Sequence, residues 1–375
     1  MREDWQTVKL GDVLKTSSGG TPTRSRKEYY EGGKIPWLMS GEVAQGNVYE
    51  AKKFITEEGL KNSSAKMFPP ETVLVAMYGA TAGQVGILRV ESTTNQAVCG
   101  IFPSQEYVPE FLYYSILQQQ KDLIKAATGN AQPNISQTKI KDIQIPLPPL
   151  AEQERIVSIL DKAFEGIDKA IAQTEQNLAS ARELFESYLN SLDFSKHSLG
   201  QYVTIRTGKL NANAAVDEGE YPFFTCSREI SRINAYAFDM EAILLAGNNA
   251  SGDFNVKHYA GKFNAYQRTY VISAKEDSLD YRFLYHQLNK SLKELKRSAV
   301  GAGTKFLKLG MIQDLKIQVP SVEQQQATAK TLDQLLGRSS KLEALYTQKL
   351  KDLKELKQSL LQQAFAGELT KEDAA

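Results

Sequence analysis

The feature that most constrains this chain is an internal repeat. The segment IKDIQIPLP at residues 140–148 aligns with IQDLKIQVP at residues 312–320, at a constant offset of 172 residues. The same offset aligns further positions: Phe111-Leu112-Tyr113 with Phe283-Leu284-Tyr285, Gln153 with Gln325, and Leu160-Asp161 with Leu332-Asp333. Between these anchors the two halves diverge. A repeated frame with different interiors indicates one mechanical role performed twice on two targets.

Each half of the repeat shows the same internal order. A looser match of residues 9–13 with residues 198–202, at an offset of 189, joins the two starts. Short β-like runs follow, such as residues 72–77 and 268–272, and glycine-containing loops separate them. A proline-bounded exit and a long helix complete each half. A chain of 375 residues is long enough for two such domains.

The long helices are predicted from apolar residues spaced three and four apart. In the first helix these are Ile156, Leu160, Phe164, Ile167, Ile171, Leu178, Phe185, Tyr188 and Leu192, with Thr174 and Ala181 as weaker positions. In the second they are Leu332, Leu335, Leu342, Tyr346, Leu353, Leu356 and Leu360, interrupted by Ser339 and Lys349. Helices of about 40 residues would be ~60 Å long. Each apolar seam needs a partner, either its own domain or the other helix; we favour an antiparallel coiled coil, because the two seams match in length.

The composition excludes several classes of protein. The apolar fraction of 42% and the charged fraction of 24% are typical of globular proteins, and no apolar run reaches the ~18 residues of a membrane span. Residues 1–5 lack the apolar core of a signal peptide. Cys99 and Cys226 have no partner at disulfide or metal-ligand spacing, and the chain has three histidines. We therefore expect a cytoplasmic protein without a zinc site.

The net charge of +1 conceals a segregation of charge along the chain. Residues 151–193 carry nine acids and four bases, residues 321–375 carry eight of each, and the remainder carries 33 bases and 27 acids. The excess of bases therefore lies outside the predicted helices. Such a distribution is compatible with nucleic-acid binding by the two domains.

Three motifs resemble those of the DNA-specificity subunits of type I restriction-modification systems. They are PLPPLAEQERIV at residues 146–157, LLQQAFAGEL at residues 360–369 and SGGTP at residues 18–22. The first motif has a physical sense of its own. Pro148 and Pro149 cannot continue a preceding strand, and Glu152 and Glu154 favour the positive N-terminus of a helix.

The resemblance implies an architecture and a set of partners. The fold would be α+β, with two similar target-recognition domains alternating with two long helices that pair as an antiparallel coiled coil, in approximate two-fold symmetry. The implied boundaries are 1–148 for the first recognition domain, 149–194 for the central helix, 195–320 for the second recognition domain, and 321–375 for the C-terminal helix and tail. Each domain would read one half of a bipartite site in double-stranded DNA. The helices would set the spacing and dock two methyltransferase subunits, and restriction subunits would join the complex.

The second half departs from the family motifs in two places. TGKLN at residues 207–211 takes the place of GGTP in the first half. PSVEQ at residues 320–324 matches the junction motif of residues 146–157 only weakly. The predicted architecture is unaffected by these differences. Loop residues carry over less securely to the second domain.

The sequence lacks the motifs of a self-sufficient enzyme. A DNA methyltransferase needs a glycine-rich cofactor loop and an Asn- or Asp-Pro-Pro-aromatic loop, and the proline pairs at 69–70 and 148–149 have no such polar residue before them. The glycine loops at 79–86 and 301–305 match neither a dinucleotide-binding nor a phosphate-binding pattern, and we predict turns there. We therefore predict no catalytic residue and no cofactor; S-adenosylmethionine and ATP would belong to partner subunits.

Candidates for DNA contact follow from the chemistry of base and phosphate recognition. Arg and Lys bind phosphates and guanine, Asn and Gln bind adenine, and glycine loops offer backbone amides. In the first domain the candidates are Thr21, Thr23, Arg24, Arg26, Tyr78, Thr81, Gln84, Asn95, Gln96 and Lys139. In the second they are Lys209, Arg228, Arg232, Asn248, Asn249, Lys257, Gln267, Arg268 and Lys305. For each, the alternative is an ordinary solvated side chain or a turn former.

Aromatic residues of both domains offer a further way to contact bases. They are Tyr29, Tyr30, Trp37, Tyr266 and Tyr270. Stacking on bases is chemically feasible, but we expect these rings to pack in the core or at its rim.

The favoured function is sequence-specific DNA binding and delivery of partner enzymes. One alternative is a self-sufficient methyltransferase or nuclease, which cofactor binding by the isolated chain would support. The other is a coiled-coil scaffold that binds no DNA, which salt-dependent DNA binding would exclude. The bases recognised are not predictable, because they depend on loop geometry in the divergent interiors.

Overall fold

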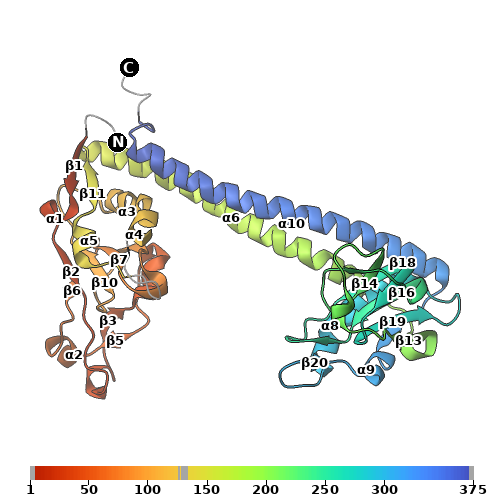
Figure 1. Ribbon diagram of the computed structural model, residues 1–375. Helices are drawn as coiled ribbons and strands as arrows, with labels where there is room; N and C mark the ends of the chain where they lie inside the picture. The colour runs from red at the N-terminus through yellow and green to blue at the C-terminus, as the bar shows by residue number, and fades with distance from the viewer. Residues whose placement is uncertain (1–4, 126, 128–133, 371–375) are drawn as a thin grey trace. The chain divides into compact units, whose positions relative to one another are not determined.

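The computed structural model describes residues 5–125, 127 and 134–370 (Figure 1). The outermost parts of the predicted boundaries, residues 1–4 and 371–375, lie outside the described residues. Helices and sheets are both present, which confirms the α+β class. Two helices far exceed the others in length, as predicted: α6 (Leu150–Ser191) and α10 (Val322–Phe365).

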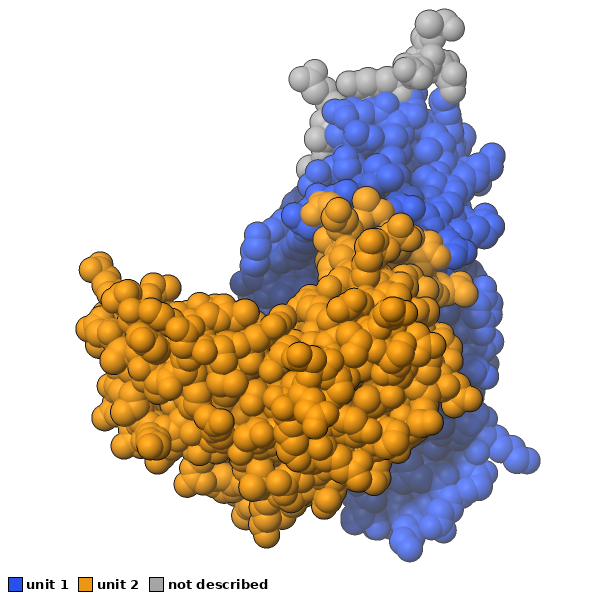
Figure 2. All heavy atoms as spheres, turned by 90° about the vertical axis from the view of Figure 1, so that its right-hand side faces the viewer, with its two compact units in different colours: residues 1–174, 349–375 blue, residues 175–348 orange. Residues whose placement is uncertain are grey.

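The chain divides into two compact units (Figure 2). Unit 1 comprises residues 1–174 and 349–375, and unit 2 comprises residues 175–348. Both α6 and α10 therefore contribute one part to each unit. The division of the chain into four consecutive segments stays a prediction.

Unit 1 contains a five-stranded sheet of order β2-β10-β7-β8-β4, a four-stranded sheet of order β5-β3-β9-β6, and the pair β1-β11. The central strand β7 has the sequence VLVA and is buried along its whole length, as expected for a strand covered on both faces. The elements are β1 (Gln6–Lys9), α1 (Leu10–Val13), β2 (Thr16–Ser18), η1 (Lys27–Tyr29), β3 (Ile35–Leu38), η2 (Ser40–Gln45), β4 (Asn47–Val48), β5 (Phe54–Ile55), α2 (Glu57–Lys61), β6 (Met67–Phe68), β7 (Val73–Ala76), η3 (Gly79–Thr81), β8 (Val85–Leu88), β9 (Ser92–Thr94), β10 (Val98–Ile101), α3 (Pro109–Gln118), α4 (Gln120–Lys125), α5 (Gln137–Lys141) and β11 (Gln144–Leu147).

Unit 2 contains a six-stranded sheet of order β13-β19-β16-β18-β14-β15 and the pairs β12-β21 and β17-β20. Apart from the two long helices, the longest helix of this unit, α8, begins where the Asp280 carboxylate accepts a hydrogen bond from the Phe283 amide at 2.7 Å. The elements are β12 (Lys196–Ser198), α7 (Leu199–Tyr202), β13 (Val203–Thr207), η4 (Ala212–Ala214), β14 (Tyr221–Phe224), β15 (Ser231–Ile233), β16 (Phe238–Ala246), β17 (Asn248–Asn249), β18 (Val256–Ala265), β19 (Thr269–Ala274), α8 (Tyr281–Ser298), β20 (Lys305–Phe306), α9 (Leu309–Gln313) and β21 (Lys316–Gln318).

The sheets of the two units are built on one plan. The order β13-β19-β16 repeats β2-β10-β7. The antiparallel run of β16 and β18 is divided in unit 1 between the pairs β7-β8 and β6-β9. β14 lies parallel to the end of β18 as β3 lies parallel to β9, and β15 adds to β14 as β5 adds to β3. The sequence repeat is therefore a repeat of strand order, direction and register.

The break between β6 and β7 has a local cause. Pro69 and Pro70 follow β6, and proline cannot donate a backbone hydrogen bond to a neighbouring strand. Glu71, the next residue, has a φ of 69°, and its carboxylate pairs with Arg89. The corresponding stretch of unit 2 contains no proline, so β16 continues without interruption.

The long helices lie side by side within each unit and run in opposite chain directions (Figure 1). In unit 1 the beginning of α6 meets the end of α10: Lys357 Nζ lies 2.6 Å from Asp168 Oδ1, and the Thr370 hydroxyl donates to Glu152. In unit 2, the Ser339 hydroxyl donates to the carbonyl of Ala181 at 2.5 Å. The predicted antiparallel pairing is therefore present in both units.

The apolar seam differs from its prediction at a few positions. The weaker positions Thr174 and Ala181 are buried, with exposed fractions of 1% and 5%. The prediction was wrong for Leu356, which is 46% exposed, and Leu189, which was not predicted, is buried. Leu192 lies beyond the end of α6. No helix in the described part of the chain is long and apolar enough to span a membrane.

A buried glutamine joins each domain to its long helix. Gln153 donates from Nε2 to the carbonyls of Glu106 and Pro148 and accepts at Oε1 from the amide of Val108, all at 2.9 Å. Gln325 makes the equivalent contacts, 172 residues on, with the carbonyls of Ser278 and Pro320 and the amide of Asp280. Both side chains are fully buried. An apolar replacement would leave three buried backbone groups unpaired, so these positions demand an amide.

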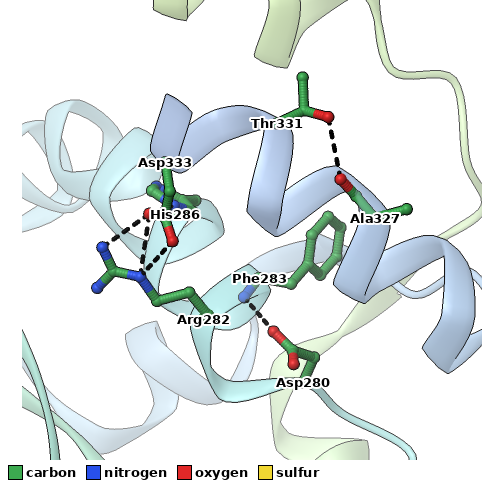
Figure 3. Close-up of polar contacts among 7 residues, drawn as sticks. All are labelled: Asp280, Arg282, Phe283, His286, Ala327, Thr331 and Asp333. Atoms are coloured by element: carbon green, nitrogen blue, oxygen red, sulfur yellow. Dashed lines mark hydrogen bonds and ion pairs between the residues drawn. The ribbon is translucent and has the colours of Figure 1, made fainter. Parts of the chain in front are cut away.

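A second contact between domain and helix differs chemically between the units. In unit 1 the hydroxyl of Tyr114 on α3 donates to Asp161 Oδ1 of α6 at 2.6 Å. The aligned residues of unit 2 are His286 and Asp333, whose Nε2 and Oδ1 lie 2.8 Å apart. Arg282 also donates to both carboxylate oxygens of Asp333 (Figure 3).

The groups of this second contact in unit 2 have shifted pKa values. Burial lowers the pKa of His286 below its ordinary value of 6.5, although the hydrogen bond to Asp333 opposes that shift. Burial would raise the pKa of Asp333, but hydrogen bonds from Arg282 and His286 outweigh it and hold that pKa below 3.8. The folded unit therefore favours a neutral imidazole beside an ionised carboxylate.

We predict that His286→Tyr removes part of the pH dependence of the free energy of unfolding. Because the pKa of His286 is lower in the folded chain than in the unfolded chain, the unfolded chain binds more protons below a pH of ~6.5. Stability should therefore fall as the pH drops from that value through the folded pKa. Tyrosine at this position copies the Tyr114 contact and does not titrate there. Denaturant unfolding of the full chain at a series of pH values measures the slope.

The reciprocal variant provides the matched control for this prediction. Tyr114→His should introduce a pH dependence into the unfolding of unit 1, because it places a titratable imidazole in the equivalent buried position. Identical slopes in the parent chain and in His286→Tyr would contradict the prediction.

Candidate nucleic-acid interface

The predicted contact residues gather mainly on two loop edges, one in each unit. Loop edge 1 comprises residues 18–26, 77–84, 94–97 and 134–135 of unit 1. Loop edge 2 comprises residues 207–211, 226–228, 247–253, 266–268 and 305–307 of unit 2. Each edge is assembled from segments that are far apart in the sequence.

Backbone hydrogen bonds join the segments of both edges in the same way. In loop edge 1 the amide of Met77 donates to the carbonyl of Ala97 at 2.8 Å. In loop edge 2 the amide of Gly247 donates to the carbonyl of Arg268 at 2.8 Å. These positions correspond in the repeat, so the two edges share one backbone frame.

The shared frame brings independently predicted residues to the same position. Tyr78 follows the central strand β7 and forms an isolated bridge with Asn134. Asn248 follows the equivalent strand β16 and pairs with Phe306. Tyr78 is 40% exposed, whereas Asn248 is half-buried. The same point of each edge thus presents a phenol in unit 1 and an amide in unit 2.

A glutamine stands at a second shared position. Gln96 and Gln267 are both exposed and precede the residues that bond to the central strand. The Thr21 hydroxyl donates to Gln96 Oε1, and Gln267 Nε2 donates to Asn211 Oδ1 at 2.6 Å. Each glutamine side chain is therefore held by a hydrogen bond to one neighbouring side chain and still remains exposed. A fixed amide can bind the edge of an adenine through a donor and an acceptor.

Two glycines permit the close approach of strands behind these glutamines. A Cβ at Gly19 would lie 2.3 Å from the carbonyl oxygen of Thr94. A Cβ at Gly208 would lie 1.7 Å from the carbonyl oxygen of Ala265. Since no side chain fits at either distance, the position of each glutamine turn depends on its glycine.

The arginines and the asparagine of loop edge 1 differ in exposure. Thr23, Arg24 and Arg26 are exposed, and the guanidinium of Arg26 lies 5.8 Å from the centre of the Tyr29 ring. Asn95 is 7% exposed, and its Oδ1 accepts from the backbone amide two residues on, at 3.2 Å. The arginines can reach a ligand directly, whereas Asn95 shapes the turn that carries Gln96.

The predicted turn at 79–86 lies between β7 and β8, except that its last two residues, Val85 and Gly86, already belong to β8. The Thr81 hydroxyl donates to the carbonyl of Tyr78 at 3.3 Å, and Gln84 Oε1 accepts from Gln120 at 3.4 Å. Lys139 lies on the short helix α5, whose Gln137 accepts from Ser18 of β2 at 3.2 Å. The structure therefore brings α5 beside the first strand of loop edge 1.

Loop edge 2 contains a cluster of basic side chains. Arg228 Nη2 pairs with Asp253 Oδ2 at 2.7 Å, and the Arg268 guanidinium lies 5.4 Å from the centre of the Phe306 ring. Lys305 pairs with Asn249 in the two-residue ladder β17-β20. The predicted turn at 301–305 is present, with Gly301 at a φ of 112° and a bridge between Val300 and Phe306.

Asn249 and Lys257 hold the loops of this edge from within. Asn249 Oδ1 accepts from the amide of Asp253 at 3.1 Å. Lys257 Nζ donates to the carbonyl of Ser227 at 2.5 Å. Burial, and to a smaller extent Arg228, lower the pKa of Lys257 below its ordinary value. The geometry thus makes these two residues supports for the side chains around them.

The remaining two candidates of unit 2 differ in setting. Lys209 is exposed beside Gly208, within loop edge 2. Arg232 lies on β15 and donates to the carbonyls of Gly219 and Glu220 at 2.8 and 2.9 Å. Its guanidinium therefore secures the hairpin of β14 and β15.

Lys296, a basic residue of α8 that contacts loop edge 2, was missed by sequence reasoning. A Cβ added to Gly252 would lie 3.4 Å from Cγ of both Lys296 and Lys305. Lys296 stands in the last turn of α8, followed by Arg297. The signal available in the sequence was this basic end of an amphipathic helix, but its distance from Gly252 in the sequence concealed the contact.

The arrangement offers hydrogen bonding and positive charge. In the described residues, no three His, Cys, Asp or Glu side chains are placed to share a metal ion. Burial raises the pKa of the Cys99 thiol to about 12, so it stays protonated near neutral pH. Fixed amides beside arginine and lysine are the groups that bind base edges and phosphates.

Comparison with known proteins connects this chain to one family. A family model described as type I restriction modification DNA specificity domain matches residues 2–178 and 192–352. The EcoDI specificity subunit of a type I restriction enzyme from Escherichia coli is 42% identical over 181 residues, which cover 48% of this chain and 40% of that protein. The MjaIX specificity subunit from Methanocaldococcus jannaschii is 25% identical over 362 residues, which cover 85% of this chain and 83% of that protein.

A solved structure gives the same result for the fold. A chain from work on complex assembly and conformational transition of the type I R-M system has a TM-score of 0.75 at 19% identity. The match covers 98% of this chain and 99% of that one. The alignment with the E. coli relative, by contrast, spans less than half of that relative's own length, at 40%.

We predict that Gly208→Ala destabilises unit 2 and displaces the Gln267 turn. The added methyl group would overlap the carbonyl of Ala265, and such overpacking costs about 1–3 kcal/mol in free energy of unfolding. Amide hydrogen exchange should quicken in β13 and β19, whereas Gly337→Ala, in an open position on α10, should not destabilise the chain. Unchanged exchange in β13 and β19 of the Gly208→Ala chain would contradict the proposed close approach.

Proposed function

Because this chain belongs to the type I restriction-modification DNA specificity family, we propose that it is the subunit that selects the DNA sequence for such a complex. Each recognition domain binds one half of a bipartite site in double-stranded DNA. The chain delivers two methyltransferase subunits to that site, and restriction subunits join them. The bases recognised are set by the side chains of loop edges 1 and 2.

The repeated frame of the two loop edges carries this proposal. The frame places Tyr78 and Asn248 at one shared position, and Gln96 and Gln267 at another. A backbone that is constant while its side chains vary suits a protein that performs one task on two sequences. An enzyme site copied twice would instead retain the same reactive side chains in both copies.

The chemistry of the edges favours DNA over a protein partner. Arg24 and Arg26 of loop edge 1 are exposed, and loop edge 2 gathers Arg228, Arg268 and Lys305. Guanidinium and ammonium groups bind phosphates and the guanine edge, while the two glutamine amides suit adenine. This combination supports DNA binding over a scaffold that binds no DNA.

The long helices serve as the connection between the recognition domains. Both α6 and α10 pass from one unit into the other as uninterrupted helices. We propose the segments 1–148 and 195–320 as recognition domains, and 149–194 and 321–375 as the helical spacer that docks the methyltransferase subunits. A helix changes length by about 1.5 Å per residue, so such a spacer sets a distance by its residue count.

The reactions of the complex belong to the partner subunits in this proposal. The chain is non-catalytic and cytoplasmic, and S-adenosylmethionine and ATP bind to the partners. The rival proposal is a self-sufficient methyltransferase or nuclease. The loop edges do not support it, because they contain glutamines and basic residues but no sequence pattern of a cofactor loop.

We predict that the two domains can be exchanged independently. Residues 20–135 are replaced with the corresponding region of a related subunit, and the chain is expressed with its methyltransferase partner. A genome-wide methylation map should then show one half of the site changed and the other half retained, because each loop edge reads its own half. The purified chain without partners should transfer no methyl group and cut no DNA.

Two outcomes contradict this proposal. If both half-sites change together, the domains are not independent readers. Methyl transfer by the purified chain alone would support the rival enzyme. As a control, residues 207–306 are replaced in the same way, and this exchange should change the other half-site.

We also predict that helix length sets the gap between the half-sites. One turn of four residues is inserted in α6 between Ile171 and Leu178, and another in α10 after Gln348, where the chain passes between the units. Each insertion adds ~6 Å, which corresponds to one or two base pairs at ~3.4 Å each. Alanine, leucine and glutamate keep the seam apolar through the stutter.

The methylation map should show the same two half-sites with a longer gap. As the control, four residues at each insertion point are replaced with the inserted sequence, which keeps the length and should keep the gap. An active lengthened variant with the parental gap would show that the helices do not set this distance.

A further inference from the structure

The two loop edges differ in charge at one equivalent position. In loop edge 2, Gly252 packs against the side chain of Lys296 on α8. In loop edge 1, Gly83 packs against Ile124 on α4, and a Cβ added to Gly83 would lie 2.7 Å from Ile124 Cγ1. Ile124 precedes Lys296 by 172 residues, the offset of the repeat. An exposed apolar side chain and an exposed base therefore occupy the same place in the frame.

Lys296 belongs to a group of charges that lacks sufficient acid. Lys296 and Lys305 flank Gly252, and Arg228 lies across the same loop. Asp253 is the carboxylate of this group, and Arg228 occupies it at 2.7 Å. Within the described part of the chain, neither lysine has an ion-pair partner. The two ammonium groups are therefore available to an anion.

The surface beside Gly252 is hollowed into a cleft that an anion can enter from solvent. Arg228, Gly252, Asp253, Lys293 and Lys296 line a cleft of about 360 Å³ between α8 and the start of β18. Of the two basic side chains of α8 that line this cleft, Lys293 is engaged by Glu186 at 2.7 Å, so Lys296 remains for a ligand. The cleft borders the loop that carries Asn248 and Asn249.

We propose that Lys296 and Lys305 bind a phosphate of the DNA backbone, and that loop edge 1 has no such contact because Ile124 replaces the first of them. The inference rests on the proposed function and adds an asymmetry to it. The second recognition domain therefore makes a phosphate contact that the first domain does not make at the equivalent position.

The test measures the salt dependence of binding by the full chain. Fluorescence anisotropy with a labelled duplex, over a series of potassium chloride concentrations, gives the slope of log K against log salt. Each phosphate contact contributes about 0.9 to that slope, so loss of this one contact in Lys296→Ala with Lys305→Ala should reduce it by about 1. The matched control is Lys169→Ala with Lys351→Ala, two lysines paired to acids on the long helices, and should leave it unchanged.

Two further variants separate charge from folding. Lys296→Arg with Lys305→Arg retains both charges and should retain the slope. Ile124→Lys transfers the contact to loop edge 1 and should increase the slope by about 1. A gain in the slope cannot arise from damage to the fold.

The outcomes distinguish this inference from the proposed function. If the parent chain shows no salt-dependent DNA binding, the proposed function fails and this inference with it. If the parent chain binds DNA with a salt-dependent affinity but the lysine pair can be removed without effect on the slope, the inference alone is overturned. An unchanged slope in Ile124→Lys would likewise refute the equivalence of the two positions.

Discussion

Each unit depends on one buried side-chain amide at the point where a strand is followed by a long helix. Gln153 and Gln325 each donate hydrogen bonds to two backbone carbonyls and accept one from a backbone amide. Asparagine offers the same two donors and one acceptor, but its side chain is shorter. The prolines before them end the strand, so the helix begins without a continuing ladder. The direction of each long helix relative to its own domain follows from this contact.

A consequence of the fixed junction is that recognition chemistry and support are separated. The frame residues are glycines and backbone amides, such as Gly19, Gly208 and the amide of Met77, which specify positions without specifying bases. The side chains carried by this frame can differ between the units, as Tyr78 and Asn248 do at one shared position. Charge also varies independently of the frame, as Ile124 and Lys296 illustrate.

Much of the architecture was predictable from the sequence because the repeat and the seams are long-range patterns. The α+β class, both long helices and the turns at 79–86 and 301–305 were found in this way. The position of Lys296 was not, because its neighbour Gly252 is distant in sequence and only folding brings them together. Asn95 was selected for its chemistry, but its burial depends on a turn that residue type alone does not reveal. The separation of β6 from β7 was not predicted either, because it results from two prolines together with the strained backbone of Glu71.

The offsets within the repeat record how such a chain can evolve. The starts of the two halves differ by 189 residues, whereas the strands from β7 onward and the junctions differ by 170 to 172. The length difference between the halves is thus confined to the stretch between β2 and β7 in unit 1. A duplicated gene can therefore gain or lose material in that stretch without shifting the register of the core. Genetic crossovers at the repeated junctions would join complete modules, so one half of the chain could be exchanged without refolding of the other.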